Sequence, residues 1–281
     1  MSVASRAYTE QDVEDFFDKT LHNYLSFWDT DGVLHTGYFA DGNADDYHAA
    51  AAHTSAVLAA EAMIDSSSHV LDVGSGCGNF LMYLAGHFDC SGEGLDLSEQ
   101  RVRFAMARLA GEKSLRITFR HGSATQMPYQ ASTFTHVVSQ DSLCLVPDKP
   151  RSHAEIMRVL VPGGIFAFTD FLQPKKQVSE RARKHVYDRV RWNGGYSFIG
   201  YQEALDSRGF EIMVARNLSG HLRQTYRVLG KTAEERAESV PDLTARNWML
   251  AFADSCREMQ VAIDDEEFGW GIFVARKRTR A

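Results

Sequence analysis

A glycine-rich segment and one acid carry the clearest chemical signal in this sequence. Val70–Val73 is a short apolar run of the kind that forms a buried strand, and the segment Gly74–Gly78 (Gly-Ser-Gly-Cys-Gly) follows it. Glycines let the backbone turn tightly there and approach a ligand closely. A second predicted strand, Cys90–Leu97, carries Asp96 near its end. A glycine loop after one strand and an acid at the tip of the next is how an open α/β sheet holds an adenosine ribose.

The spacing of the glycines argues against a dinucleotide as the ligand. A dinucleotide fingerprint has glycines at its first, third and sixth positions, the last one for close packing of the following helix. Counted from Gly74, the sixth position is Asn79, so this fingerprint fails. The pattern Gly-x-Gly-x-Gly instead resembles the first motif of class I S-adenosylmethionine-dependent methyltransferases. In that family the loop lies against the methionine part of S-adenosylmethionine (SAM).

Further segments match that family in the same order along the chain. His121–Ala124 stands where the family contacts adenine, and Phe134–Ser139 is the predicted fourth strand. Leu160–Gly164 ends in Pro-Gly-Gly, which predicts a turn that ends the preceding helix. A fifth strand is predicted directly after this turn, over Ile165–Asp170.

The resemblance implies an α/β fold, namely a Rossmann-like, seven-stranded mixed sheet with an N-terminal helical lid and an insertion after the fifth strand. Residues 1–54 would form the lid, residues 55–171 the SAM-binding core, and residues 172–281 the cap insertion and the last strands. The residue patterns predict helices over Val13–Trp28, Ser152–Leu160, Val178–Trp192 and Leu243–Met259, and strands over Leu115–Phe119, Phe210–Arg216 and Phe268–Ala275.

A narrower resemblance is to the sarcosine/dimethylglycine N-methyltransferases. It rests on Ser139–Ser142 after the fourth strand, on Thr169–Gln173 after the fifth, on Trp28 ahead of His35–Tyr38, and on Trp270–Phe273.

Two residues depart from this narrower family. Leu145 stands where the family tends to have a histidine on the expected substrate side, and Asp96 stands where it tends to have an asparagine at the ribose. Tocopherol and terpenoid C-methyltransferases share several of the same motifs. The resemblance therefore identifies the cofactor and leaves the acceptor open.

The resemblance implies SAM as the cofactor and a direct in-line displacement of its methyl group. Such a transfer needs an aligned acceptor lone pair and the exclusion of water, with neither a covalent enzyme intermediate nor a metal. The cofactor-binding residues that follow from the family motifs are Tyr24, Gly37, Asp72, Gly74, Gly76, Asp96, Leu97, Ser123, Ala124 and Gln140.

An amine acceptor must lose its ammonium proton before transfer, and a nearby carboxylate or histidine would help. Asp141 and His35 are the candidates for this catalytic role. Each has a structural alternative: Asp141 could cap the helix after the fourth strand, and His35 could be a structural residue of the lid. Asp170 could face either substrate or solvent.

A methylated tertiary amine or thioether keeps a positive charge, which aromatic faces stabilise. An acceptor that bears a carboxylate would also favour an arginine clamp, from Arg191 or Arg223. The aromatic candidates are Trp28, Tyr38, Phe171, Trp192, Tyr196 and Tyr201, with packing in the core as the alternative for each.

Composition indicates a soluble globular protein. The chain has 281 residues, 44% of them hydrophobic and 24% charged, and a net charge of −7. Basic residues cluster only in the tail Arg276–Arg280, so we expect no nucleic-acid partner. We expect no membrane partner, because no apolar run approaches the ~18 residues of a spanning helix and the N-terminus is polar. Four isolated cysteines indicate a reducing cytoplasm, and a homodimer remains an option.

The predicted function is SAM-dependent methyl transfer to a small molecule, with a glycine-type amine such as sarcosine or dimethylglycine as the preferred acceptor. A thioether amino acid such as methionine is the close alternative, because its sulfur needs no base. An O- or C-methyltransferase of natural-product biosynthesis comes third. A catalytically silent SAM-binding protein is the alternative from a different functional class.

Overall fold

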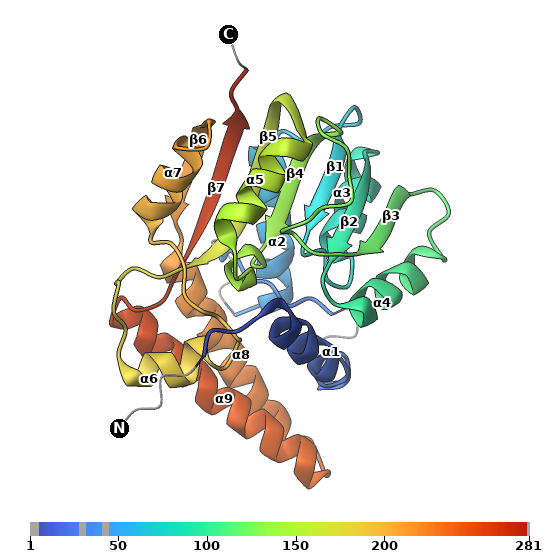
Figure 1. Cartoon of the computed structure of the whole chain (residues 1–281). Helices are drawn as coiled ribbons and strands as arrows, with labels where there is room; N and C mark the ends of the chain where they lie inside the picture. Colours follow the sequence, from blue (N-terminus) through green and yellow to red (C-terminus); the bar gives the residue numbers. More distant parts are fainter. Residues whose placement is uncertain (1–5, 28–31, 41–44, 280–281) are drawn as a thin grey trace.

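Seven strands form one mixed sheet in the computed structural model, which describes residues 6–27, 32–40 and 45–279 (Figure 1). The strands are β1 (His69–Val73), β2 (Ser91–Asp96), β3 (Arg116–His121), β4 (Phe134–Gln140), β5 (Leu160–Leu172), β6 (Phe210–Asn217) and β7 (Gly269–Lys277). Their order is β3-β2-β1-β4-β5-β7-β6. The first five strands run parallel to one another, and β7 is antiparallel to both β5 and β6. The predicted seven-stranded mixed sheet is confirmed.

Helices cover both faces of the sheet and one of its ends. They are α1 (Glu10–Phe27), α2 (Tyr47–Glu61), α3 (Asn79–Phe88), α4 (Glu99–Leu109), α5 (Lys149–Val159), α6 (Glu180–Ala182), α7 (Phe198–Asp206), α8 (Ser219–Ser239) and α9 (Leu243–Asp264). A 3-10 turn, η1 (Leu143–Leu145), follows β4, and a short π-helix, η2 (Arg183–Tyr187), continues α6. The boundary expected at residue 54 falls inside α2.

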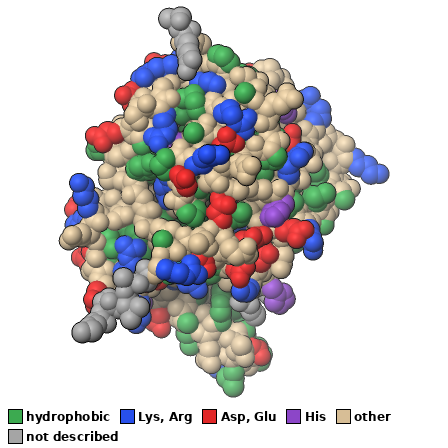
Figure 2. All heavy atoms as spheres, viewed as in Figure 1, with side chains coloured by type: hydrophobic (Ala, Val, Ile, Leu, Met, Phe, Trp, Pro, Cys, Tyr) green, Lys and Arg blue, Asp and Glu red, His purple; other side chains and the backbone are tan. Residues whose placement is uncertain are grey.

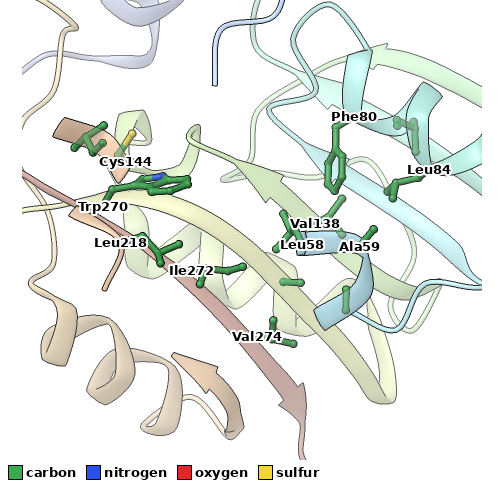
Figure 3. Close-up of a cluster of buried hydrophobic side chains, with 14 of the residues drawn as sticks. Leu58, Ala59, Phe80, Leu84, Val138, Cys144, Leu218, Trp270, Ile272 and Val274 are labelled. Carbon is green, nitrogen blue, oxygen red and sulfur yellow. The ribbon is translucent and has the colours of Figure 1, made fainter. Parts of the chain in front are cut away.

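The two faces of the sheet bury different side chains because successive residues of a strand point to opposite sides. In β1, Val70 packs in the cluster that includes α2, α3 and α4, whereas Leu71 packs in the cluster that includes α5 and α7. Figure 3 shows part of the first cluster, in which Leu58 of α2 and Phe80 of α3 lie near Val138 of β4. Because both faces of the sheet are buried, the sequences of the central strands are nearly continuous apolar runs.

The remaining helices gather at one end of the sheet. Figure 1 shows α1, α6, α8 and α9 on the side where the parallel strands end. The helices α8 and α9 pack on one another through a third apolar cluster that includes Leu229 and Phe252, and Tyr47 of α2 joins it. Of these elements, α1, α8 and α9 supply the wall that faces the carboxyl ends of the strands.

Two predicted elements differ from the structure. The segment Leu160–Gly164 is the first part of β5 rather than a turn before it: Leu160 pairs with Phe134, Ile165 pairs with His136, and the residues between form a bulge. Gly163 adopts φ +76° there, which explains the glycine. The helix predicted over Val178–Trp192 is limited to α6 and η2.

The outer surface mixes both signs of charge. Figure 2 shows Lys and Arg side chains interspersed with Asp and Glu over the face that it draws. Within the described residues, no helix is long and apolar enough to cross a membrane.

Candidate active site

A cavity of about 240 Å³ lies at the carboxyl ends of β1, β2 and β4. Residues of the glycine loop and of these strand ends line one side, and residues of α1, α8 and α9 line the other. The strand that follows β1 in the sequence, β2, lies on one side of β1, and β4 lies on its other side. The cavity therefore lies where the order of the strands in the sheet reverses. Open α/β sheets bind their ligands at this position.

The glycine loop has a shape that side chains would prevent. Gly74 adopts φ +75°, and a Cβ atom there would lie 1.7 Å from the Ser142 Oγ. Its N–H donates to the Leu95 carbonyl at 2.7 Å, which ties the loop to β2. Gly78 adopts φ +85° at the start of α3, where a Cβ would lie 2.6 Å from the Phe119 ring. The loop therefore presents bare backbone to the cavity.

Asp96 joins the glycine loop to the start of α4. Its Oδ2 accepts the Gly76 N–H at 2.7 Å, and its Oδ1 accepts the Ser98 N–H at 2.8 Å. An ionised carboxylate has about four acceptor positions, so each oxygen can still accept one more hydrogen bond. Two vicinal ribose hydroxyls are donors of this kind.

Asp72 lines the cavity with an unsatisfied acceptor. The residue is 2% exposed, and its Oδ2 has no hydrogen-bond partner within the described part of the chain. Burial, and then the neighbouring Asp96 carboxylate, raise the pKa of Asp72 to about 8. A buried carboxylate without a partner is costly, and a cationic group in the cavity would remove that cost. The ammonium of SAM fits this requirement.

The expected adenine-binding segment is only partly in the cavity wall. Leu97, Gly122 and Ala124 line the cavity. The Ser123 Oγ instead donates to the Glu10 Oε1 at 2.7 Å and so holds α1 in place.

Helix α1 is fastened over this side of the cavity by two further polar contacts. The Glu14 Oε1 lies 3.3 Å from the His121 Nε2, and the Ser98 Oγ donates to the Asp18 carboxylate. The N-terminal helix is therefore attached to the segments that follow β2 and to the end of β3.

Asp141 lines the cavity and is a junction for three distant segments. Its Oδ1 accepts from the Thr169 Oγ1 at 2.8 Å and the Trp270 Nε1 at 2.6 Å, and its Oδ2 accepts the Thr36 N–H at 2.6 Å. The expected alternative of helix capping does not describe it, because the N-cap residue of η1 is Ser142 and no side chain caps this turn. Asp141 itself adopts φ +51°, which turns the chain out of β4.

His35 and Gln140 also line the cavity. The His35 Nε2 lies 3.1 Å from the Ala51 carbonyl, and the His35 carbonyl accepts from the Tyr47 hydroxyl at 2.9 Å. The Gln140 Nε2 donates to the Ser55 Oγ at 3.2 Å. Contacts to α2 therefore orient the lid segment at His35 and the end of β4.

Of the described aromatic candidates for an acceptor pocket, Phe171 alone lines the cavity. Trp192 is fully buried and stacks on Tyr187 with ring centroids 4.4 Å apart. Tyr201 is fully buried on the other face of the sheet, and Tyr196 packs on it at 4.9 Å. Core packing, the stated alternative, describes these three.

Tyr38 lies outside the cavity wall as well and stacks on the His221 ring at 4.3 Å. The Gly37 N–H donates to the Thr225 Oγ1 at 3.0 Å, so this segment is fixed to α8 rather than facing the cavity. Trp28 lies outside the described residues, as does the side chain of Tyr24, whose backbone is part of α1.

The two arginines expected to clamp an acceptor do not line the cavity, and a neighbour does. Arg223 is an exposed ion-pair partner of Asp264 at 2.7 Å. The Arg191 Nη1 donates to the Asp188 carbonyl at 2.8 Å. Arg189 lies in the cavity wall, with its guanidinium carbon 5.3 Å from the centroid of the Phe252 ring.

Asp170 faces neither substrate nor solvent. It is fully buried, and its Oδ1 accepts the Cys144 N–H at 2.9 Å while its Oδ2 accepts from the Tyr201 hydroxyl. Burial raises the pKa of Asp170 to about 6. The Lys149 Nζ donates to the Cys144 and Gly194 carbonyls at 2.7 and 3.2 Å. This network supports η1 from beneath the cavity.

Several lining residues were not foreseen: Glu14, Phe17, Arg101, Arg189, Tyr226, Leu229 and Phe252. The helical spacing of apolar residues in α1 indicated a buried face without saying what it covers. No local signal assigned α8 and α9 to the cavity. Within the described residues, no group of three or more His, Cys, Asp or Glu side chains could hold a metal ion, and the four buried cysteines form no disulfide there.

Comparison with known proteins gives a match to a family described as a methyltransferase domain, over residues 71–168. The phosphoethanolamine N-methyltransferase 1 of Triticum aestivum is 28% identical over 76% of this chain and 42% of its own length. The glycine/sarcosine/dimethylglycine N-methyltransferase of Actinopolyspora halophila is 27% identical over 98% of the chain and 51% of its own length. The chain thus spans about half or less of these relatives. It spans 96% of the sarcosine/dimethylglycine N-methyltransferase of Halorhodospira halochloris, which is 27% identical over 99% of the chain.

Solved structures share the whole fold. A structure titled as a putative sarcosine dimethylglycine methyltransferase from Galdieria sulphuraria superimposes with a TM-score of 0.81 at 20% identity, over 93% of this chain and 99% of that one. The [4+2]-cyclase SpnF superimposes with a TM-score of 0.80 at 22% identity, over 98% of both chains. Proteins named as a cyclase and as a methyltransferase therefore share this fold, so the function of this chain has to be inferred from its site.

Proposed function

We propose that this chain is a class I SAM-dependent methyltransferase and that its acceptor is a small amine that carries an anionic group. A glycine-type amine such as sarcosine or dimethylglycine is the first candidate. The observation that carries this proposal is the position of Arg189 in the cavity wall. The relatives named for glycine derivatives and for phosphoethanolamine act on amines of this kind and support it.

SAM brings an electrophilic methyl group on a positively charged sulfur. The residues that would hold it are those of the glycine loop, Asp96 toward the ribose hydroxyls, Asp72 toward the ammonium, and Leu97 and Ala124 toward the base. Asp72 fits because it is buried and its Oδ2 lacks a hydrogen-bond partner within the described residues. Helix α1 is held against this side of the cavity and would exclude water from it.

The other side of the cavity would orient the acceptor. The Arg189 guanidinium would pair with a carboxylate or phosphate, and this pairing would fix the direction from which the nitrogen approaches. The rings of Phe171 and Tyr226 also line the cavity and would stabilise the positive charge that a methylated amine retains.

Asp141 is the group that we propose receives the ammonium of the acceptor. Three of its roughly four acceptor positions are filled by Thr169, Trp270 and Thr36, which leaves one position on Oδ2. An ammonium that donates there would be oriented by a carboxylate whose own position is fixed. Asp141, together with His35 in the same wall, would then take up the proton that the amine releases.

A second candidate function is methylation of an oxygen or carbon on an apolar natural product. The observation that favours it is the apolar character of the wall formed by Leu34, Leu145, Val146, Pro147 and Leu229. An apolar acceptor would gain from burial against these side chains and would not need Arg189. A thioether amino acid would use Arg189 without needing a base, and a protein without catalytic activity would bind SAM alone.

The test compares Arg189→Met with Arg223→Met, a control at an exposed ion pair outside the cavity. We expect Arg189→Met to raise KM for sarcosine or phosphoethanolamine about 10- to 100-fold, the effect of losing a charge-assisted hydrogen bond. The KM for dimethylethanolamine, an amine without an anionic group, should change little, and Arg223→Met should leave both values near those of the wild type. Equal effects on both amines, or turnover of terpenoid alcohols alone, would contradict the proposal.

A further inference from the structure

Arg101 stands out among the cavity residues because part of its buried guanidinium makes no hydrogen bond. It lies in the first turns of α4, is 8% exposed, and lines the cavity. Its Nε and Nη2 atoms are buried without a hydrogen-bond partner within the described residues. Its guanidinium carbon lies 4.1 Å from the centroid of the Phe17 ring, so α1 covers one face of the guanidinium.

Two acids close to Arg101 in the sequence, Asp96 and Glu99, and one acid of α1, Asp18, have other partners. The Asp96 carboxylate accepts the backbone N–H groups of Gly76 and Ser98. The Asp18 carboxylate accepts from the Ser98 Oγ, and Glu99 pairs with the exposed Arg103 at 2.8 Å. A guanidinium has five donors and keeps its charge at any ordinary pH, so its burial without an anion is costly. An anion bound in the cavity would remove this cost.

The position of Arg101 indicates which anion this is. Its Nη1 lies 3.9 Å from the place where a Cβ on Gly76 would sit, so it faces the glycine loop. Arg189, the other arginine of the cavity wall, lies beside Phe252 of α9, on the wall that faces the strand ends. The glycine-loop side of the cavity thus holds a carboxyl, that of Asp72, and a guanidinium, that of Arg101, each with buried polar atoms that lack a hydrogen-bond partner. An α-amino acid group, with one ammonium and one carboxylate, matches this pair of charges.

We propose that Arg101 binds the α-carboxylate of SAM. The planar guanidinium can donate two parallel N–H bonds to a carboxylate, and the ring of Phe17 restricts its plane in advance. SAM carries a single anionic group, so no other part of the cofactor could take this role. Arg101 is then a binding residue for the cofactor, and this assignment is independent of which acceptor is methylated.

The experiment measures the binding of SAM and of decarboxylated SAM by calorimetry, without any acceptor. Decarboxylated SAM keeps the adenosine, the sulfonium and the ammonium and lacks only the carboxylate. We expect the wild type to bind SAM about 10- to 100-fold more tightly than decarboxylated SAM. Arg101→Met, which keeps most of the apolar stem of the side chain, should weaken SAM binding by that factor and change decarboxylated SAM less than about twofold. Arg101→Lys should fall between.

Arg103→Met is the matched control, because Arg103 lies two residues further along the same helix with its charge at the surface. It should leave the affinity for both ligands unchanged. The proposal is overturned if Arg101→Met weakens both ligands equally, which would assign Arg101 to the adenosine or to folding, or if it weakens neither. The wild-type comparison tests the proposal even if the variant does not fold, because equal affinity for the two ligands would also overturn it.

Discussion

Replacement of Asp72 by Asn tests whether the buried carboxylate binds the cofactor as an anion. The pKa of Asp72 is raised to about 8, first by burial and then by Asp96, so the carboxyl is mostly protonated in the empty cavity at neutral pH. The ammonium of SAM favours the ionised form. Binding of SAM should therefore release a proton, and the affinity should rise with pH until the carboxyl is ionised without help from the ligand.

The size of this effect follows from the pKa. With a value of about 8 in the empty cavity and full ionisation in the complex, roughly 0.9 proton should be released per bound SAM at pH 7. The affinity should rise about 20-fold between pH 6 and 7.5. The pH range ends at 7.5 because an α-amino group itself titrates at about 7.7–8.0. Above that range SAM would begin to lose its own ammonium proton. In Asp72→Asn the dependence should vanish, and the affinity at pH 7.5 should fall about 10- to 100-fold.

The assay is isothermal calorimetry with SAM in two buffers of different ionisation enthalpy, at several pH values across this window. The difference between the two buffers gives the number of protons released. Wild-type affinity that is flat with pH, with no proton released, would refute the role assigned to Asp72. Asp72→Asn should also affect stability in a defined direction. A carboxyl with a raised pKa binds its proton more tightly in the folded state, so wild-type stability without ligand falls as the pH rises from about 4 to 8, and Asp72→Asn should lack this loss.

Three further substitutions test other parts of the site. Asp141→Asn places an amide NH2 group where the carboxylate now accepts hydrogen bonds, so denaturant titration should show a free energy of unfolding lower by about 1–3 kcal/mol. The variant should lose more turnover with an amine acceptor than with a thioether, and equal losses with both would contradict a role of Asp141 as the base. Gly74→Ala would place a methyl group 1.7 Å from a serine Oγ at φ +75°, so calorimetry should detect no SAM binding, whereas Gly220→Ala, with nothing within 4 Å, should bind normally. Phe171→Ala should raise the KM for the acceptor because Phe171 lines the cavity, whereas Trp192→Phe should lower the melting temperature and leave KM unchanged because Trp192 is buried outside it. A changed KM in Trp192→Phe would show that Trp192 contacts the substrate.

The sheet and the glycine loop were predictable because their signals are local. An apolar run with glycines directly after it specifies β1 and its turn, and alternation of side chains specifies the strands that follow. Asp96 was predictable for the same reason, since its place depends only on where β2 ends. The bulge at Gly163 was missed because a Pro-Gly-Gly sequence fits a turn and a bulged strand equally well.

The acceptor side was less predictable because it depends on packing between distant segments. The rings of Tyr226 and Phe252 reach the cavity only because α8 and α9 pair with each other beside the strand ends. Trp192 was expected at the site because it is aromatic and lies after β5, but it lies in the core beside Tyr187. Arg189 and Arg191 differ by two positions, and which one lines the cavity depends on how the chain leaves η2.

The most direct test of the central claim is transfer of a deuterated methyl group from SAM, followed by mass spectrometry of the acceptor. The panel contains sarcosine, dimethylglycine, phosphoethanolamine, methionine and a terpenoid alcohol, and calorimetry confirms that SAM is bound. We predict a labelled methyl group on the nitrogen of at least one amine that carries a carboxylate or phosphate, and none on the terpenoid. Label on the terpenoid oxygen or carbon alone, or on no compound while SAM is bound, would contradict the proposal that the acceptor is an amine paired with Arg189.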